Sequence, residues 1–202
     1  DKKHEEFIEE LITKYHVGNL IFMQGTPEKQ ALLNNQYQAL SKVPLLIGFD
    51  GEWGLDMRLK NTFRYPWNMA LGAVSDTTLI QQFGERLGVH CKRLGIHINF
   101  APVVDINTNP ENPIIGNRSF GENKENVTEK SIAFTKGMQQ AGVLASAKHF
   151  PGHGDTATDS HHTLPVINFD KKRLDTLELY PYKKMFDAGV ASVMTAHLSI
   201  PQ

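Results

Sequence analysis

A dense group of ionisable side chains lies between residues 148 and 162 of the sequence. The group comprises Lys148, His149, His153, Asp155, Asp159, His161 and His162. An apolar run over residues 143–147 leads directly into it, and two glycines, Gly152 and Gly154, lie within it. This order predicts a buried strand that ends in a polar, glycine-rich loop, which is where barrel enzymes place their active-site residues. The pattern therefore indicates an enzyme.

Asp159 and His161 have the spacing of an acid/base pair. In a loop, a carboxylate two residues from an imidazole can accept a hydrogen bond from one ring nitrogen and leave the other nitrogen facing a substrate. The carboxylate then fixes the tautomer and favours the protonated ring, which suits proton transfer near neutral pH. The alternative is a solvated loop in which Asp159 only caps the next turn.

Lys148 and His149 close the predicted strand. A lysine at the end of an apolar strand is costly to bury without a partner. We expect Lys148 to donate hydrogen bonds to ligand hydroxyl or carbonyl groups, with His149 beside it. The alternative for Lys148 is an ion pair with an aspartate of a neighbouring strand.

Three further charged residues follow other predicted strands. Asp50 follows an apolar run and could accept two hydrogen bonds from a pair of sugar hydroxyls, with Arg58 close by. Arg118 lies in a turn-rich loop and could hold a polar ligand. The alternatives are a turn in which Asp50 pairs with Arg58, and an ordinary surface arginine.

Two other readings of polar and aromatic residues stay open at this point. The imidazoles and carboxylates of residues 149–162 could bind zinc, nickel or iron, although their spacing matches no common metal motif. Trp53, Phe63, Tyr65 and Trp67 could stack on a sugar face or pack the loop that carries them. We expect neither a metal nor a cofactor.

The elements that must position these residues alternate between apolar runs and amphipathic segments. Strands are predicted over 20–23, 45–49, 96–104, 143–149 and 191–196. Helices are predicted over 7–15, 27–37, 75–94 and 124–140, and in two pieces between 170 and 188. Ser75 is the expected N-cap of the third helix, and Pro181 is expected in the first turn of the last piece.

Continuous apolar strands that alternate with helices predict a parallel sheet covered by helices. Polar residues end four of the strands, and they would surround one mouth of a barrel or line the crevice of an open sheet. A complete (β/α)8 TIM barrel takes about 250 residues, whereas this chain has 202. We therefore expect an incomplete barrel of about five to six strands. Residues 1–202 would form one partial catalytic domain, truncated at both ends, that could self-associate through its unclosed edges.

The composition limits the classes of partner that we expect for the protein. The chain is 40% hydrophobic and 21% charged, which is ordinary for a globular protein, and its net charge of -1 gives no reason to expect nucleic acid as a partner. No apolar run reaches the roughly 20 residues that span a bilayer. The single Cys91 is expected to be a small buried hydrophobe. A bacterial periplasmic or cytoplasmic location stays open.

Together these residues resemble the glycoside hydrolase family 3 β-N-acetylglucosaminidases of the NagZ type. The resemblance rests on the motifs Phe-Asp-Gly-Glu at 49–52, Asn-Arg-Ser-Phe-Gly at 117–121, Lys-His-Phe-Pro-Gly-His-Gly at 148–154, and Asp-Ser-His at 159–161. It implies a TIM barrel that removes terminal β-linked N-acetylglucosamine with retention, from peptidoglycan-derived or related saccharides. A β-glucosidase-like member and a non-catalytic sugar-binding barrel are the alternatives, and a small saccharide is the expected partner in each case.

The resemblance also implies roles for individual residues. His161 would be the general acid/base and Asp159 its partner. The sugar-binding set would be Asp50, Arg58, Arg118, Lys148 and His149. The family's nucleophile is an aspartate after the seventh strand, no residue here matches it, and the 202 residues alone are expected to be inactive. The family's usual Glu-Gly-Gly is Glu52-Trp53-Gly54 in this sequence, a change that could reshape the loop.

Overall fold

The computed structural model describes residues 2–156, 164–167 and 169–201. Its five strands form one parallel sheet in the order β1-β2-β3-β4-β5. The strands are β1 (Asn19–Ile21), β2 (Leu46–Phe49), β3 (Ile98–Asn99), β4 (Leu144–Phe150) and β5 (Ser192–Thr195). Strand order follows chain order, so each crossover places the next strand on the same side and the sheet curls in one direction. This is part of a TIM-like barrel, as the sequence predicted.

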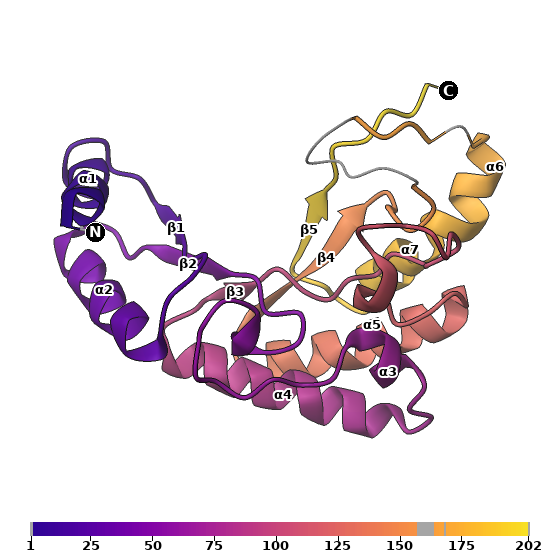
Figure 1. Cartoon of the computed structure of the whole chain (residues 1–202), viewed down its shortest axis with the longest axis horizontal. Coiled ribbons are helices and arrows are strands. Elements are labelled where there is room, and N and C mark those ends of the chain that lie inside the picture. The colour runs from indigo at the N-terminus through magenta and orange to yellow at the C-terminus, as the bar shows by residue number, and fades with distance from the viewer. Residues whose placement is uncertain (1, 157–163, 168, 202) are drawn as a thin grey trace.

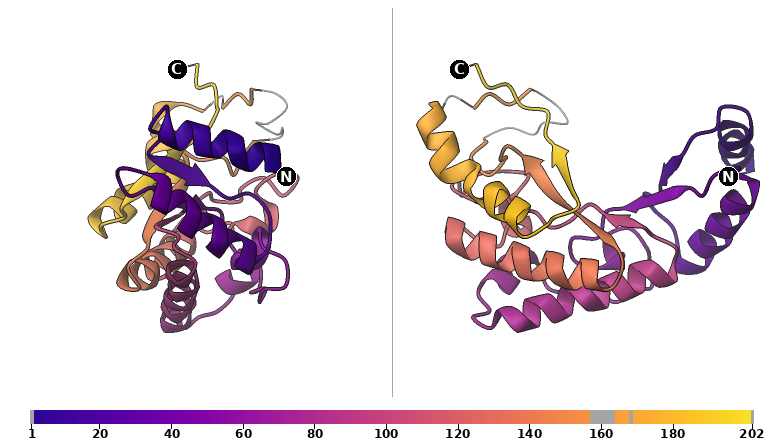
Figure 2. Two further views of the ribbon diagram at one scale, coloured as in Figure 1. Left: turned by 90° about the vertical axis from the view of Figure 1, so that its left-hand side faces the viewer. Right: turned by 180° about the vertical axis from the view of Figure 1, so that it is seen from behind.

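Helices cover the outer face of this curled sheet. They are α1 (Lys2–Thr13), α2 (Pro27–Leu40), α3 (Asn68–Gly72), α4 (Thr77–Arg93), α5 (Lys124–Gln140), α6 (Lys171–Arg173) and α7 (Tyr180–Asp187). Short helical turns occupy Leu55–Met57, Gly116–Arg118 and Leu174–Glu178. Figure 1 shows α1 and α2 at one end of a crescent, α6 and α7 at the other, and α4 and α5 side by side beneath the central strands. The view from behind in Figure 2 shows the same arrangement.

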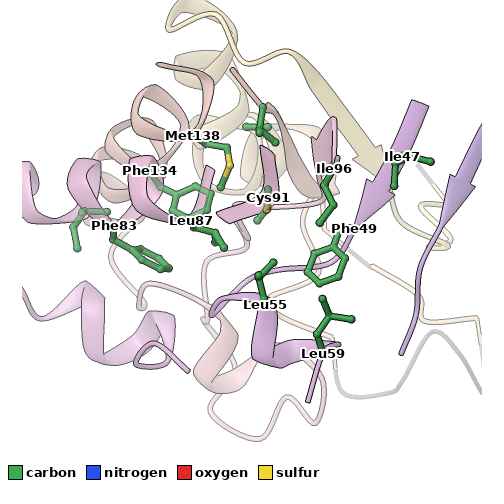
Figure 3. Close-up of a cluster of buried hydrophobic side chains, with 14 of the residues drawn as sticks. Ile47, Phe49, Leu55, Leu59, Phe83, Leu87, Cys91, Ile96, Phe134 and Met138 are labelled. Carbon is green, nitrogen blue, oxygen red and sulfur yellow. The ribbon is translucent and has the colours of Figure 1, made fainter. Parts of the chain in front are cut away.

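The main hydrophobic cluster lies between the sheet and the α4–α5 pair (Figure 3). Phe83, Leu87 and Cys91 of α4 meet Phe134 and Met138 of α5 there, and all five are buried. Cys91 is an unpaired, fully buried thiol, as predicted, and burial raises its pKa to about 12. The thiol therefore serves as a small apolar side chain.

Two glycines allow α4 and α5 to approach closely. A Cβ on Gly84 would lie 2.2 Å from the carbonyl oxygen of Phe134, and one on Gly137 would lie 2.0 Å from that of Gln81. Carbon and oxygen atoms cannot approach so closely, so any larger residue would push the helices apart.

Two details of the sequence prediction were wrong. The N-cap of α4 is Asp76, whose carboxylate accepts a hydrogen bond from the Thr78 amide at 2.9 Å, and not Ser75. The strand expected over 96–104 is a regular ladder only at Ile98–Asn99. Beyond it Pro102 has no N–H to donate, although its carbonyl still accepts from the Lys148 amide at 3.1 Å. Pro181 lies in the first turn of α7, as predicted.

Candidate active site

A cavity of about 720 Å³ opens at the carboxyl ends of the strands. All five predicted sugar-binding residues line it. Its lining comprises Asp50, Glu52, Trp53, Met57, Arg58, Ile114, Arg118, Lys148, His149, His153, Met194, Thr195, Ala196 and His197. The residues come from the ends of β2, β4 and β5 and from the loops after β2 and β3, so the parallel sheet brings together groups that are up to about 150 positions apart.

Asp50 is the first residue after β2 and is held by two cations. The carboxylate contacts Arg58 Nη2 at 2.7 Å and Lys148 Nζ at 3.0 Å. Burial alone would raise the pKa of Asp50, but Lys148 and Arg58 lower it below its usual value. The residue is therefore an ionised, oriented acceptor at the cavity wall, and its side chain remains 17% exposed to a ligand.

Lys148 forms an ion pair, the alternative given above to ligand binding, but its partner does not belong to an adjacent strand. An aspartate of the neighbouring strand would be Asp105, after β3. Instead Lys148 reaches past β3 to Asp50 and also contacts Glu52 at 2.8 Å. Its side chain is only 2% exposed. Two carboxylates thus offset the cost of burying this ammonium group.

Glu52 is a residue whose importance the sequence prediction missed. Its fully buried carboxylate accepts two hydrogen bonds from Arg118, at 2.9 Å to Nε and 2.7 Å to Nη2, in addition to the contact with Lys148. Burial would raise its pKa, but Lys148 and Arg118 lower it from 4.5 to about 2. Glu52 therefore fixes both cations. Arg118 is thereby part of the site and not an ordinary surface arginine.

The position of His149 depends on a local irregularity of β4. Lys148 pairs with Met194 and Phe150 with Thr195, so β4 has one extra residue at position 149. Such a bulge re-aims side chains next to active sites. It explains how two successive residues, Lys148 and His149, both line the cavity.

Asp105 holds the His149 ring in place and is a second site residue that the sequence did not reveal. Its carboxylate accepts from His149 Nδ1 at 2.6 Å and from the backbone amides of His149 and His153 at 3.2 and 2.7 Å. Burial would raise the pKa of Asp105, but the His149 ring and these amides lower it. Because Arg118 can only donate, its 3.3 Å contact with His149 Nε2 fits a ring protonated on Nδ1.

The loop after β4 is anchored before it reaches the predicted acid/base pair. Thr156 Oγ1 lies 2.6 Å from His153 Nδ1, and Asp155 accepts from Thr108 at 2.7 Å. Asp159 and His161 lie outside the described residues. Within the described ranges, no group of three or more histidine, cysteine, aspartate or glutamate side chains is arranged to hold a metal ion.

Comparisons with known proteins agree with this fold. Beta-hexosaminidase A of Pseudoalteromonas piscicida is 36% identical over 208 residues, covering 96% of this chain and 35% of that protein. The solved structure of a family 3 β-N-acetylglucosaminidase from Paenibacillus sp. str. FPU-7 is 44% identical, with a TM-score of 0.90, and covers 96% of this chain and 38% of that one. NagZ from Neisseria gonorrhoeae, solved in complex with N-trifluoroacetyl-D-glucosamine, is 32% identical, with a TM-score of 0.88, and covers 96% and 60%.

This chain therefore spans between about a third and three fifths of the length of these relatives. No helix in the described part of the chain is long and apolar enough to cross a membrane. The sequence matches the glycosyl hydrolase family 3 N-terminal domain over residues 1–202. The protein accordingly belongs to glycosyl hydrolase family 3.

Proposed function

We propose that the full-length protein containing this chain is a retaining exo-β-N-acetylglucosaminidase. It would hydrolyse terminal β-linked N-acetylglucosamine from peptidoglycan-derived or related saccharides. The observation that carries the proposal is the set of polar side chains around Asp50. Fixed carboxylate, guanidinium, ammonium and imidazole groups surround one cavity, and a sugar presents alternating hydroxyl donors and acceptors to such groups. The names of the relatives support N-acetylglucosamine as the sugar.

Each group of the cavity would have a defined task. Asp50 would accept hydrogen bonds from two neighbouring hydroxyls, because its carboxylate lines the cavity and has lone pairs beyond the two that the cations use. Lys148 and Arg118 would donate to hydroxyl or carbonyl oxygens, and Arg58 would hold the Asp50 carboxylate in place. His149 would line the sugar pocket with its ring, since Asp105 and Arg118 already use its two nitrogens. These roles require no movement of the cations, since Asp50 and Glu52 already hold them.

The proposed reaction is a double displacement. A nucleophilic carboxylate forms a bond to the anomeric carbon while the glycosidic bond breaks, and His161 gives its proton to the leaving oxygen. Water then attacks the same carbon, gives a proton to His161 and releases the carboxylate. Asp159 would orient the His161 ring throughout. We assign the nucleophile to no residue of this chain, and we propose that it is supplied by another part of the full-length protein.

The overall function is tested with aryl β-N-acetylglucosaminide and aryl β-glucoside as substrates of the full-length protein. The proposal predicts efficient hydrolysis of the first and weak hydrolysis of the second. Comparable rates would favour a β-glucosidase-like enzyme instead. Binding of N-acetylglucosamine without hydrolysis of either substrate would favour a non-catalytic barrel. Loss of activity with a chelator, restored by a metal, would favour a metal-dependent hydrolase.

The role of His161 is tested by its leaving-group dependence. His161→Ala should slow hydrolysis of a methyl glycoside by about 10²–10⁴-fold, the usual contribution of general acid catalysis. A dinitrophenyl leaving group needs little protonation. His161→Ala should therefore slow the release of dinitrophenol much less than it slows the release of methanol. The control is His162→Ala, the adjacent histidine with no assigned role. An unchanged rate with the methyl glycoside would remove His161 from the mechanism.

Self-association of the 202-residue chain is a separate proposal. Among the described strands, β1 and β5 each pair on one edge only. Ile21, the last residue of β1, is 54% exposed, and Met23, two residues further on, is 51% exposed. Open edges and exposed apolar side chains favour pairing between copies. Sedimentation velocity should show a concentration-dependent increase in mass. A single monomeric species at all concentrations would contradict the proposal.

A further inference from the structure

Two tryptophans lie together beside the polar part of the cavity. The ring centroids of Trp53 and Trp67 are 4.3 Å apart, and the planes are tilted by 53°. The guanidinium of Arg64 lies 5.0 Å from the Trp67 ring and 5.9 Å from the Trp53 ring. Trp53 lines the cavity itself. Trp67 and Arg64 do not line the cavity, and they pack against the Trp53 ring. The three residues therefore form an aromatic wall with a cation against it.

This wall is not part of the hydrophobic core. Tyr65, which lies between the two tryptophans in sequence, packs against the main cluster through Phe83 at a centroid distance of 4.7 Å. Neither Trp53 nor Trp67 is among the described residues that pack against either hydrophobic cluster. Both indoles are partly exposed. Packing of the loop therefore accounts for Tyr65, and it does not account for the ring that Trp53 presents to the cavity.

The backbone fixes the position of Trp53. Its carbonyl accepts a hydrogen bond from the Tyr65 amide at 3.0 Å, which ties the two sides of the loop together. Gly54 follows with a φ of 108°, a conformation that favours glycine, and a Cβ there would lie 2.9 Å from the Tyr65 ring. Glu52, on the other side, is locked by Arg118. The backbone that carries the indole is thus held in place before a ligand binds, which lowers the cost of ordering it.

We propose that Trp53 is the platform for the ring that is attached to the hydrolysed N-acetylglucosamine, a second binding subsite on the leaving-group side. This inference rests on the proposed function. In the proposed function the polar groups around Asp50 bind one sugar, and Trp53 lines the same cavity with a partly exposed ring that those groups do not use. A pyranose carries an apolar face of C–H groups, and a partly exposed indole is a surface that such a face covers well. The ligand class is a β-linked disaccharide or longer saccharide with a pyranose ring in the second position.

The test compares two substrates of the full-length protein that differ only in the leaving group, which is either a methyl group or a second sugar ring. Methyl β-N-acetylglucosaminide has no second ring, whereas N,N′-diacetylchitobiose has one. Trp53→Ala should lower kcat/KM for the disaccharide by about tenfold, the effect of losing one aromatic contact. It should leave kcat/KM for the methyl glycoside unchanged within about twofold. Trp53→Phe should retain most of the disaccharide rate, since a ring remains.

The matched control is Phe63→Ala. Phe63 is an aromatic of the same loop, 68% exposed, that contacts Tyr65 and does not line the cavity. It should change neither rate. Equal losses for both substrates in Trp53→Ala would show that Trp53 only maintains the site, and no loss for either would show that it contacts no ligand; both results overturn the proposal. A wild-type protein that hydrolyses neither substrate would instead refute the proposed function.

Discussion

Replacement of Glu52 by glutamine tests the ion pairs that Glu52 forms with Arg118 and Lys148 most specifically. The change keeps the size of the side chain and removes its charge. Arg118 and Lys148 would then be buried against an amide that offers a donor where the two cations need an acceptor. Removing one partner of a buried ion pair is strongly destabilising, because the charge that remains is poorly compensated. Here Arg118 loses its bidentate carboxylate and Lys148 keeps Asp50 alone of its two carboxylates.

The magnitude follows from the pKa of Glu52. Each tenfold change in acidity corresponds to about 1.4 kcal/mol, and the pKa is lowered from 4.5 to about 2. The ionised carboxylate therefore contributes roughly 3 kcal/mol to the free energy of unfolding at pH 7. Because the folded-state pKa is depressed, this contribution is present above pH 4.5 and is lost as the pH falls toward 2. It should be about 1 kcal/mol at pH 3.

Urea unfolding at both pH values measures the effect. Glu52→Gln should reduce the free energy of unfolding by roughly 3 kcal/mol at pH 7 and by about 1 kcal/mol at pH 3. Glu129→Gln is the matched control, because Glu129 is an exposed carboxylate on α5, and it should change stability by less than about 0.5 kcal/mol. If Glu52→Gln lowered the free energy of unfolding equally at both pH values, or by less than about 1 kcal/mol at pH 7, Glu52 would not be the residue that holds the two cations.

Two further predictions concern the second buried carboxylate and the helix pair. Asp105→Asn should lower kcat/KM of the full-length protein for β-N-acetylglucosaminides by about ten- to a hundredfold, since it replaces a charged acceptor that orients His149; an unchanged value would mean that the ring needs no such support. Gly84→Ala should destabilise the protein by about 1–3 kcal/mol in thermal or urea unfolding, because its Cβ would collide with the Phe134 carbonyl. Gly18→Ala, where a Cβ meets nothing within 4 Å, is its control, and equal effects would contradict the close-approach argument.

The sequence could predict the strands and their polar ends because both are local signals. Apolar runs mark β2, β4 and β5, and the charged residues follow them directly, so Asp50, Lys148 and His149 were identified from neighbours in the chain. The parallel arrangement then predicted that these ends meet at one mouth, and the structure confirms this.

The partners of these residues could not be predicted, because they depend on register and distance across the sheet. Glu52 and Arg118 are 66 positions apart, and Asp105 and His149 are 44 apart. The extra residue in β4 at His149 leaves no local mark in the sequence, yet it re-aims the ring. Burial of Glu52 was equally hidden, since a glutamate after a turn is ordinarily solvated.

We propose that the polar cavity belongs to a retaining β-N-acetylglucosaminidase. NMR observation of the first product, as the full-length protein hydrolyses an aryl β-N-acetylglucosaminide, tests this proposal. A retaining enzyme forms β-N-acetylglucosamine first, and the α anomer appears only by later mutarotation. Initial release of the α anomer, or no hydrolysis at all, would contradict it.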